Sequence, residues 1–248
     1  MPSVFSRMNR LHITTRSPCD WRERLGNPEI HWKRRASAME TSVSWERAGQ
    51  SWTGLPEPIL KLFTDSELGD SQLLLAVAEH KVPLRGTGGD SQCDVWALVK
   101  ASVGTVSLSV EAKANEPYGK DNETLEGWMK SGKSPNSASN RKSRWSHIQE
   151  NLPQANAGAY SNVPYQILQR CASAIIEARR FALKHAACVV QSFSAPAKSF
   201  DLFARFCEAA SIPAERDRMN FVQVDQVRLG IGWADCPFAT DAEMASVL

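Results

Sequence analysis

The sequence predicts an α/β fold in which helices flank a mixed β-sheet. Two neighbouring stretches, 94–98 and 106–113, have the apolar content and period-two alternation of strands. The strongest helical pattern, 165–185, leads directly into the apolar stretch 187–193, which reads as a buried strand. Helical and strand patterns then continue to alternate, which is typical of a sheet covered by helices and not of a sandwich or a bundle.

The remaining elements follow along the chain in order. Residues 1–30 are polar and Arg-rich without clear periodicity, so we expect a tail that is poorly ordered or docked on a partner. A helical pattern covers 30–50, and the run Gly54-Leu55-Pro56-Glu57-Pro58 then breaks the chain. We further expect a helix over 66–79, strands over 94–98 and 106–113, a polar surface loop over 120–144, a helix over 165–185, a strand over 187–193, a helix over 199–210 and a strand over 221–229.

We expect one domain over 31–248, since a chain of 248 residues suffices for one well-buried α/β domain. An N-terminal helical extension, 31–65, precedes the core of the domain, 66–195. A C-terminal helix and strand, 196–248, complete it. The candidate site described below lies in the core part, which is therefore the expected catalytic part.

Composition excludes several classes of protein. Hydrophobic residues make up 42% and charged residues 23%, as in ordinary globular proteins, and a net charge of +2 means that any surface for nucleic acid is local. The six cysteines form no C-x-x-C pair, which argues against structural zinc and favours a reducing compartment. The first residues contain no apolar run of signal-peptide length, and no stretch approaches the run of about 20 apolar residues that spans a membrane, so we expect neither a signal peptide nor a membrane span. We expect a cytoplasmic protein without membrane association.

Two acidic residues and a lysine stand on the pair of predicted strands. In 106–113 the alternation places Glu111 and Lys113 on one face, roughly 7 Å apart along the strand. A two-residue turn at Val103-Gly104 would make the strands an antiparallel hairpin, with Asp94 opposite Lys113 and Trp96 opposite Glu111. The two carboxylates and the amine would then share one face, at the end of the hairpin away from the turn.

This trio has the chemistry of a metal-dependent phosphodiesterase. Two neighbouring carboxylates ionise together only where a cation offsets them, and hard oxygen ligands favour Mg²⁺ or Mn²⁺. Such a cation lowers the pKa of its bound water, and a nearby ammonium orients that water or stabilises the charged transition state. The alternative is a surface Glu/Lys pair on a half-exposed strand, with an aspartate that caps a loop.

The residues around the trio carry a resemblance to known proteins. Gly86-Thr87-Gly88-Gly89-Asp90 leads to Asp94, and Glu111-Ala112-Lys113 follows. This arrangement resembles the PD-(D/E)XK nuclease superfamily, and the Gly-rich lead resembles its Mrr-like restriction branch. The string Val110-Glu111-Ala112-Lys113-Ala114-Asn115-Glu116-Pro117-Tyr118-Gly119 also resembles a family of uncharacterised bacterial proteins with a V-E-x-K-x-x-E-P-(F/Y)-G signature, over 31–233.

The resemblance implies a restriction-endonuclease-like fold and a role for each matching residue. Asp94 and Glu111 would ligate the metal together with the Ala112 carbonyl, and Lys113 would serve the attacking water. Glu79 is the candidate for the acid that a preceding helix commonly adds. A Q-x-x-x-Y motif of one branch is matched only in part, by Gln166 and Arg170, because the tyrosine is absent.

The polar segment 120–144 offers a candidate surface for nucleic acid. Its basic residues, with Trp128 and Trp145 interleaved, are of the kind that contact phosphates and unstacked bases. The alternative is a solvated loop. The candidate contacts to nucleic acid are Lys130, Lys133, Arg141, Lys142, Arg144 and, from the long helix, Arg170.

The expected function is therefore hydrolysis of phosphodiester bonds in DNA with Mg²⁺ or Mn²⁺, in bacterial restriction, defence or DNA processing. RNA is an alternative substrate, and cutting both strands of a duplex would call for a homodimer. Gln166 joins Asp94, Glu111, Lys113 and Glu79 as an expected catalytic residue. The rival function is that of a catalytically inactive nuclease-fold protein, which binds nucleic acid or another protein.

Overall fold

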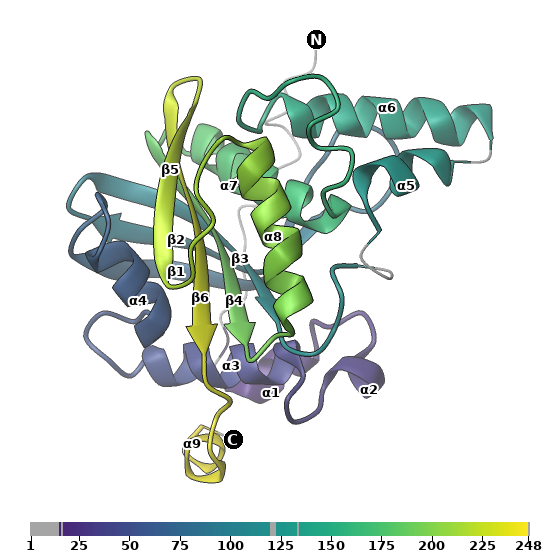
Figure 1. The fold of residues 1–248 in the computed structure, drawn as a ribbon. Coiled ribbons are helices and arrows are strands. Elements are labelled where there is room, and N and C mark those ends of the chain that lie inside the picture. The colour runs from purple at the N-terminus through teal and green to yellow at the C-terminus, as the bar shows by residue number, and fades with distance from the viewer. Residues whose placement is uncertain (1–14, 16, 120–122, 133, 248) are drawn as a thin grey trace.

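The computed structural model describes residues 15, 17–119, 123–132 and 134–247. Its centre is a six-stranded sheet with the strand order β1-β2-β3-β4-β6-β5 (Figure 1). The sheet is mixed, because β3, β4 and β6 run parallel while β1, β2 and β5 join it through antiparallel pairs. The strands are β1 (Ser71–Val82), β2 (Ser91–Ala101), β3 (Gly104–Lys113), β4 (His185–Phe193), β5 (Arg218–Val224) and β6 (Val227–Cys236).

Helices cover both faces of this sheet, which confirms the predicted α/β class. One face carries α7 and α8, and the other carries α3 and α4. The helices are α1 (Pro18–Arg22), α2 (Pro28–His31), α3 (Ser37–Ala48), α4 (Glu57–Thr64), α5 (Leu125–Lys130), α6 (Pro135–Gln149), α7 (Tyr165–Arg180), α8 (Ala197–Ala209) and α9 (Asp241–Ala245).

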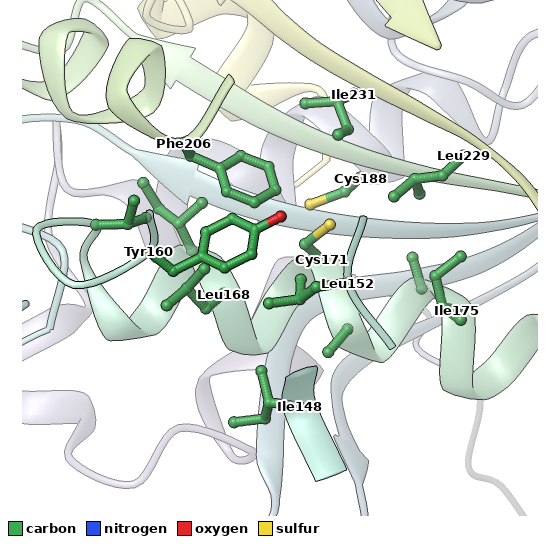
Figure 2. Close-up of a cluster of buried hydrophobic side chains, with 14 of the residues drawn as sticks. Ile148, Leu152, Tyr160, Leu168, Cys171, Ile175, Cys188, Phe206, Leu229 and Ile231 are labelled. Carbon is green, nitrogen blue, oxygen red and sulfur yellow. The ribbon is translucent and has the colours of Figure 1, made fainter. Parts of the chain in front are cut away.

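The central strands supply both hydrophobic cores through their period of two. In β4, Cys188 and Val190 belong to the core under α7 and α8, while Ala187 and Val189 belong to the core on the opposite face. Figure 2 shows the first of these cores, where side chains of α7 and α8 meet those of β4 and β6 around the ring of Tyr160. The sheet is thus fixed from both sides next to the polar residues of β3.

The predicted helix over 66–79 is wrong, since this segment is mostly the edge strand β1. Its short apolar run fits either structure, because the residues that make a helical stripe also fill a half-exposed strand. Pairing with β2 decides the outcome, and an irregularity in the register between Leu73 and Leu75 leaves Leu74 55% exposed. A strand in place of a helix changes how Glu79 is presented to the site.

The polar segment 120–144 contains two helices where the sequence predicts a surface loop. The side chains of Thr124 and Ser134 cap α5 and α6 by accepting hydrogen bonds from backbone N–H groups of the first turns. Figure 1 shows the two helices side by side at the margin of the molecule. Because α6 is mostly polar, these two helices are stabilised by their caps and by packing and not by an apolar stripe.

The two ends of the described chain also differ from the prediction in detail. Within 17–31 the chain forms α1 and α2, and Trp21 of α1 is buried and donates a hydrogen bond to Glu46 of α3 at 2.6 Å. The single strand predicted over 221–229 is a hairpin of β5 and β6, which turns at Asp225 with φ 49°. In the described part of the chain, no helix has the length and apolar content needed to cross a membrane.

Candidate functional site

The site lies where β2 separates from β3. Backbone pairing of the two strands ends at Val95 and Val110, and Asp94 is the next residue of β2 beyond that last pair. The backbone N–H of Ala112 donates a hydrogen bond to Asp94 Oδ2 at 2.6 Å. The Asp94 carboxylate thus accepts the hydrogen bond that a backbone carbonyl of β2 would accept if the pairing continued.

The register of the hairpin differs by two residues from the predicted one. Trp96 lies opposite Ser109, and not opposite Glu111. A shift of two residues keeps every side chain on its face, whereas a shift of one would have reversed them all. Glu111 and Lys113 accordingly lie on the predicted face of β3, under α7.

Strict alternation, on which the predicted placement of Asp94 depends, fails in β2. Cys93 and Trp96 belong to one cluster on the face of α7, although residues three apart in a regular strand point to opposite faces. The break lies across from Glu79 of β1, which adopts a left-handed backbone with φ 54°. Such a conformation costs free energy in a residue other than glycine and is often found at functional sites. The kink therefore directs Asp94 toward the end of β3.

Glu111 is the centre of a buried ion-pair cluster. Its side chain is 2% exposed, and Lys113 Nζ lies 2.7 Å from Oε1 while Arg170 Nε lies 2.5 Å from Oε2. Burial opposes ionisation of Glu111, but the two cations outweigh it and lower the pKa of its carboxyl. Glu111 is thus a fixed negative charge with a cation at each oxygen.

Asp94 and Glu79 have raised pKa values. Burial raises the pKa of Glu79 to about 7; repulsion by Glu111 adds to the rise, while a hydrogen bond from Gln92 at 2.5 Å opposes it. Burial also raises the pKa of Asp94 well above its usual value, with repulsion from Glu111 and Glu79. Three carboxyl groups therefore lie close together in a buried region, which disfavours ionisation of Asp94 and Glu79.

The helix α7 contributes Arg170 and Gln166 to the site. The sequence predicts a contact of Arg170 with nucleic acid, but its side chain is 9% exposed and donates hydrogen bonds to Glu111 and, at 2.9 Å, to Ser91 Oγ. The acceptor Gln166 Oε1 is buried without a hydrogen-bond partner among the described residues. The spacing of four residues on one helix face was the signal that could have placed Arg170 beside the acidic strand.

The segment after β3 supports Lys113. Tyr118 is fully buried, and the ammonium of Lys113 lies 5.1 Å from the centre of its ring. The carboxylate of Glu116 accepts a hydrogen bond from the backbone N–H of Ser37 at 3.2 Å, which joins this segment to the start of α3. Gly119 then turns with φ 61°, where a glycine carries no steric penalty. The segment Glu116-Pro117-Tyr118-Gly119 thus holds Lys113 in position and joins the end of β3 to α3.

The Gly-rich segment before Asp94 is bound to one face of α6. Asn140 exchanges two hydrogen bonds with the backbone of Thr87, and Arg144 Nη2 donates to the Gly89 carbonyl at 2.8 Å. A side chain on Gly86 would collide with Asn140, which accounts for the glycine there. The sequence does not predict this contact, because the spacing of Asn140 and Arg144 on α6 does not indicate which segment they bind.

The predicted contacts to nucleic acid are dispersed over α5 and α6. Lys130 is exposed and paired with Glu126, and Lys142 is exposed. The Arg141 guanidinium lies 4.7 Å from the centre of the Trp128 ring, whereas Arg144 is buried against the Gly-rich segment. Lys133 lies outside the described residues.

The oxygen donors at the site suit a hard divalent cation. The carboxylates of Asp94, Glu111 and Glu79 and the Ala112 carbonyl are ligands of the type that Mg²⁺ and Mn²⁺ prefer, and their accumulated charge would be offset by a cation. No three His, Cys, Asp or Glu side chains in the described ranges are grouped so as to hold a metal as they stand. The oxygen donors are therefore of the kind that a divalent metal prefers. Both oxygens of Glu111, however, form ion pairs with Lys113 and Arg170.

One family model matches almost the whole chain. Residues 14–237 match the domain of unknown function DUF6946. No curated protein and no solved structure matches the sequence significantly. The chain belongs to the DUF6946 family.

Proposed function

We propose that this family member is a Mg²⁺-dependent nuclease of restriction-endonuclease-like fold, which hydrolyses phosphodiester bonds in DNA. The observation that carries the proposal is the gathering of Asp94, Glu111 and Lys113, with Glu79 beside them, where β2 separates from β3. A strained backbone at Glu79 and a buried lysine are costly features of a fold, and a reaction at this place gives them a purpose.

Each residue of the site has a role that follows from its contacts. Asp94 and Glu111 would hold the metal together with the Ala112 carbonyl. The ammonium of Lys113, fixed by Glu111 and the Tyr118 ring, donates a hydrogen bond to the attacking water and stabilises negative charge on the phosphate. Glu79, with a pKa of about 7, exchanges a proton readily near neutral pH.

A bound Mg²⁺ lowers the pKa of its water and neutralises charge on the scissile phosphate. What supports such a cation is the convergence of Asp94, Glu79 and Glu111, since repulsion from Glu111 adds to the burial that raises the pKa values of Asp94 and Glu79. The lowered pKa of Glu111 favours its ionised form near neutral pH.

DNA is the proposed substrate, with RNA as the alternative. The exposed Lys130 and Lys142 give α5 and α6 local cations that bind phosphates, while Trp128 is stacked on the Tyr165 ring and covered by the guanidinium of Arg141. A homodimer would place two sites on a duplex. We assign the protein to the cytoplasm, where its five buried free thiols would stay reduced.

A non-catalytic binding module is the second candidate. The observation that favours it is the occupation of both Glu111 oxygens by the chain's own cations. A module of this kind would bind DNA through α5 and α6 and would retain its affinity when the divalent metal is removed.

The two functions are separated by a cleavage assay. Supercoiled plasmid and single-stranded DNA are incubated with Mg²⁺ or Mn²⁺ and wild-type protein, Lys113→Ala, or the control Lys100→Ala at the exposed far end of β2. We expect Lys113→Ala to lose at least about 100-fold in rate and the control to match wild type. Equal cleavage by Lys113→Ala, or no cleavage by any protein, contradicts the nuclease and favours the module.

A further inference from the structure

Arg170 occupies one side of the carboxylate that a metal would need. Its Nε lies 2.5 Å from Glu111 Oε2, and Lys113 Nζ lies 2.7 Å from Oε1. Both cationic side chains are nearly fully buried. The charge that a metal would offset is thus partly offset by the chain itself.

Arg170 is also held from its other side. Its Nη1 donates to Ser91 Oγ at 2.9 Å, and Ser173 Oγ donates to the same oxygen at 2.9 Å. Ser91 begins β2, and Ser173 lies one turn further along α7. The guanidinium therefore joins α7, β2 and β3 in one arrangement.

We infer that Arg170 is the resident counter-ion of Glu111, and that a divalent cation binds Glu111 by displacing the guanidinium from Oε2. The inference rests on the proposed function, because it requires a metal at Glu111. A buried guanidinium and a divalent cation on one carboxylate repel each other strongly, since few waters screen them. Arg170 therefore sets the affinity of the site for metal.

The same helix offers an acceptor for the displaced guanidinium. Gln166 lies one turn before Arg170, on the same face of α7. Its Oε1 is buried and has no hydrogen-bond partner in the described part of the chain, which is a costly state for an amide oxygen. A guanidinium that leaves Glu111 would satisfy this atom.

The test is the affinity for Mn²⁺ alone, measured from the electron paramagnetic resonance signal of the free ion. Arg170→Gln removes the charge and keeps hydrogen-bonding capacity. The matched control is Arg180→Gln, on the same helix, where Arg180 Nη1 lies 3.2 Å from the buried Glu177. We expect Arg170→Gln to bind Mn²⁺ at least about ten-fold more tightly than wild type, and Arg180→Gln to bind as wild type does.

A second variant keeps the inference testable if Arg170→Gln does not fold. Gln166→Leu removes an unsatisfied acceptor and leaves Arg170 in place, so it costs the metal-free fold little. We expect it to weaken Mn²⁺ binding by about three-fold or more, because the displaced guanidinium then lacks a partner. Unchanged Mn²⁺ affinity in Gln166→Leu contradicts the inferred displacement.

Asp94→Asn separates failure of this inference from failure of the proposed site. If Arg170→Gln and wild type bind Mn²⁺ equally and Asp94→Asn abolishes binding, the role of Arg170 is overturned and the metal site stands. If no variant binds Mn²⁺, or if Asp94→Asn binds as wild type does, both the metal site and the inference are overturned.

Discussion

Two buried glutamates in this protein have almost the same partners. Glu111 of β3 lies beside Arg170 of α7 and a second basic side chain, and Glu177 of α7 lies beside Arg180 of the same helix and a second basic side chain. The second basic side chain is Lys113 at 2.7 Å in the first cluster and His80 at 3.4 Å in the second. Both carboxylates are at most 2% exposed.

The surroundings of the two clusters differ. The ring of His80 stacks on Trp96 at 4.9 Å, and Trp96 stacks on Phe181, so the Glu177 cluster lies against aromatic side chains. The Glu111 cluster lies instead beside Asp94 and Glu79, whose pKa values are raised. The two clusters thus differ in their neighbours, which are aromatic side chains around Glu177 and further carboxyl groups around Glu111.

The largest expected difference between the clusters appears when each glutamate is replaced by alanine. The two variants should differ in the free energy of unfolding and in Mn²⁺ binding. Glu111→Ala leaves Lys113 and Arg170 buried without a carboxylate, which should cost about 3–5 kcal/mol in the free energy of unfolding and abolish Mn²⁺ binding. Glu177→Ala should cost about 1–3 kcal/mol, because its partners are 17% exposed and reach water, and should leave Mn²⁺ binding unchanged.

Urea unfolding and Mn²⁺ titration of the two variants check this prediction. Loss of Mn²⁺ binding in Glu177→Ala with an intact fold would contradict the distinction between the clusters. Mn²⁺ binding by Glu111→Ala as tight as that of wild type would contradict it equally.

The dependence of stability on pH should come next in size. The pKa of Glu79 is about 7 in the folded state and about 4.5 when unfolded, so the folded protein binds this proton more tightly. The resulting stability is fully present below pH 4.5 and is lost as the pH rises toward 7. In the absence of metal, wild type should lose up to about 3 kcal/mol in its free energy of unfolding over this pH range because Glu79 ionises. Glu79→Gln should not show this loss.

Denaturant unfolding at several pH values, with metal removed by a chelator, measures this difference. Asp94 contributes in the same direction as Glu79, because its pKa is also raised, so Glu79→Gln should retain part of the decline. Parallel stability curves for wild type and Glu79→Gln would show that folding does not raise the pKa of Glu79.

The smallest effect concerns the Gly-rich segment before Asp94. Asn140→Ala removes two hydrogen bonds from α6 to the backbone of Thr87 and should cost about 1 kcal/mol. Amide hydrogen exchange should become faster over 85–89 and stay unchanged around Glu177. Equal protection of 85–89 in both proteins would show that α6 does not hold this segment.

The pattern of residues predicted the sheet better than it predicted the site. Period-two alternation located β3, and the apolar run after α7 located β4, because burial imposes these patterns directly. The edge strand β1 was mistaken for a helix, since its apolar run lacks a distinguishing period. α5 and α6 were missed because caps and tertiary contacts, not an apolar stripe, define them.

Within the site, Glu111 and Lys113 follow from alternation alone. Asp94 does not, because the left-handed backbone of Glu79 and the end of the β2–β3 pairing direct it, and both depend on tertiary structure. The contact of Arg170 with Glu111 joins residues far apart in the chain. A single sequence gives no means of pairing such residues, although the spacing of Gln166 and Arg170 on one helix face was visible.

The proposed nuclease requires that Asp94 and Glu111 hold a divalent cation where β2 leaves β3. The most direct measurement is the anomalous scattering of manganese in crystals of the protein grown with Mn²⁺. We predict a peak in contact with the carboxylates of Asp94 and Glu111 and with the Ala112 carbonyl, and a guanidinium of Arg170 that has left Glu111. A map with no peak at these residues, with Arg170 still bonded to Glu111, would show that these residues do not hold a divalent cation.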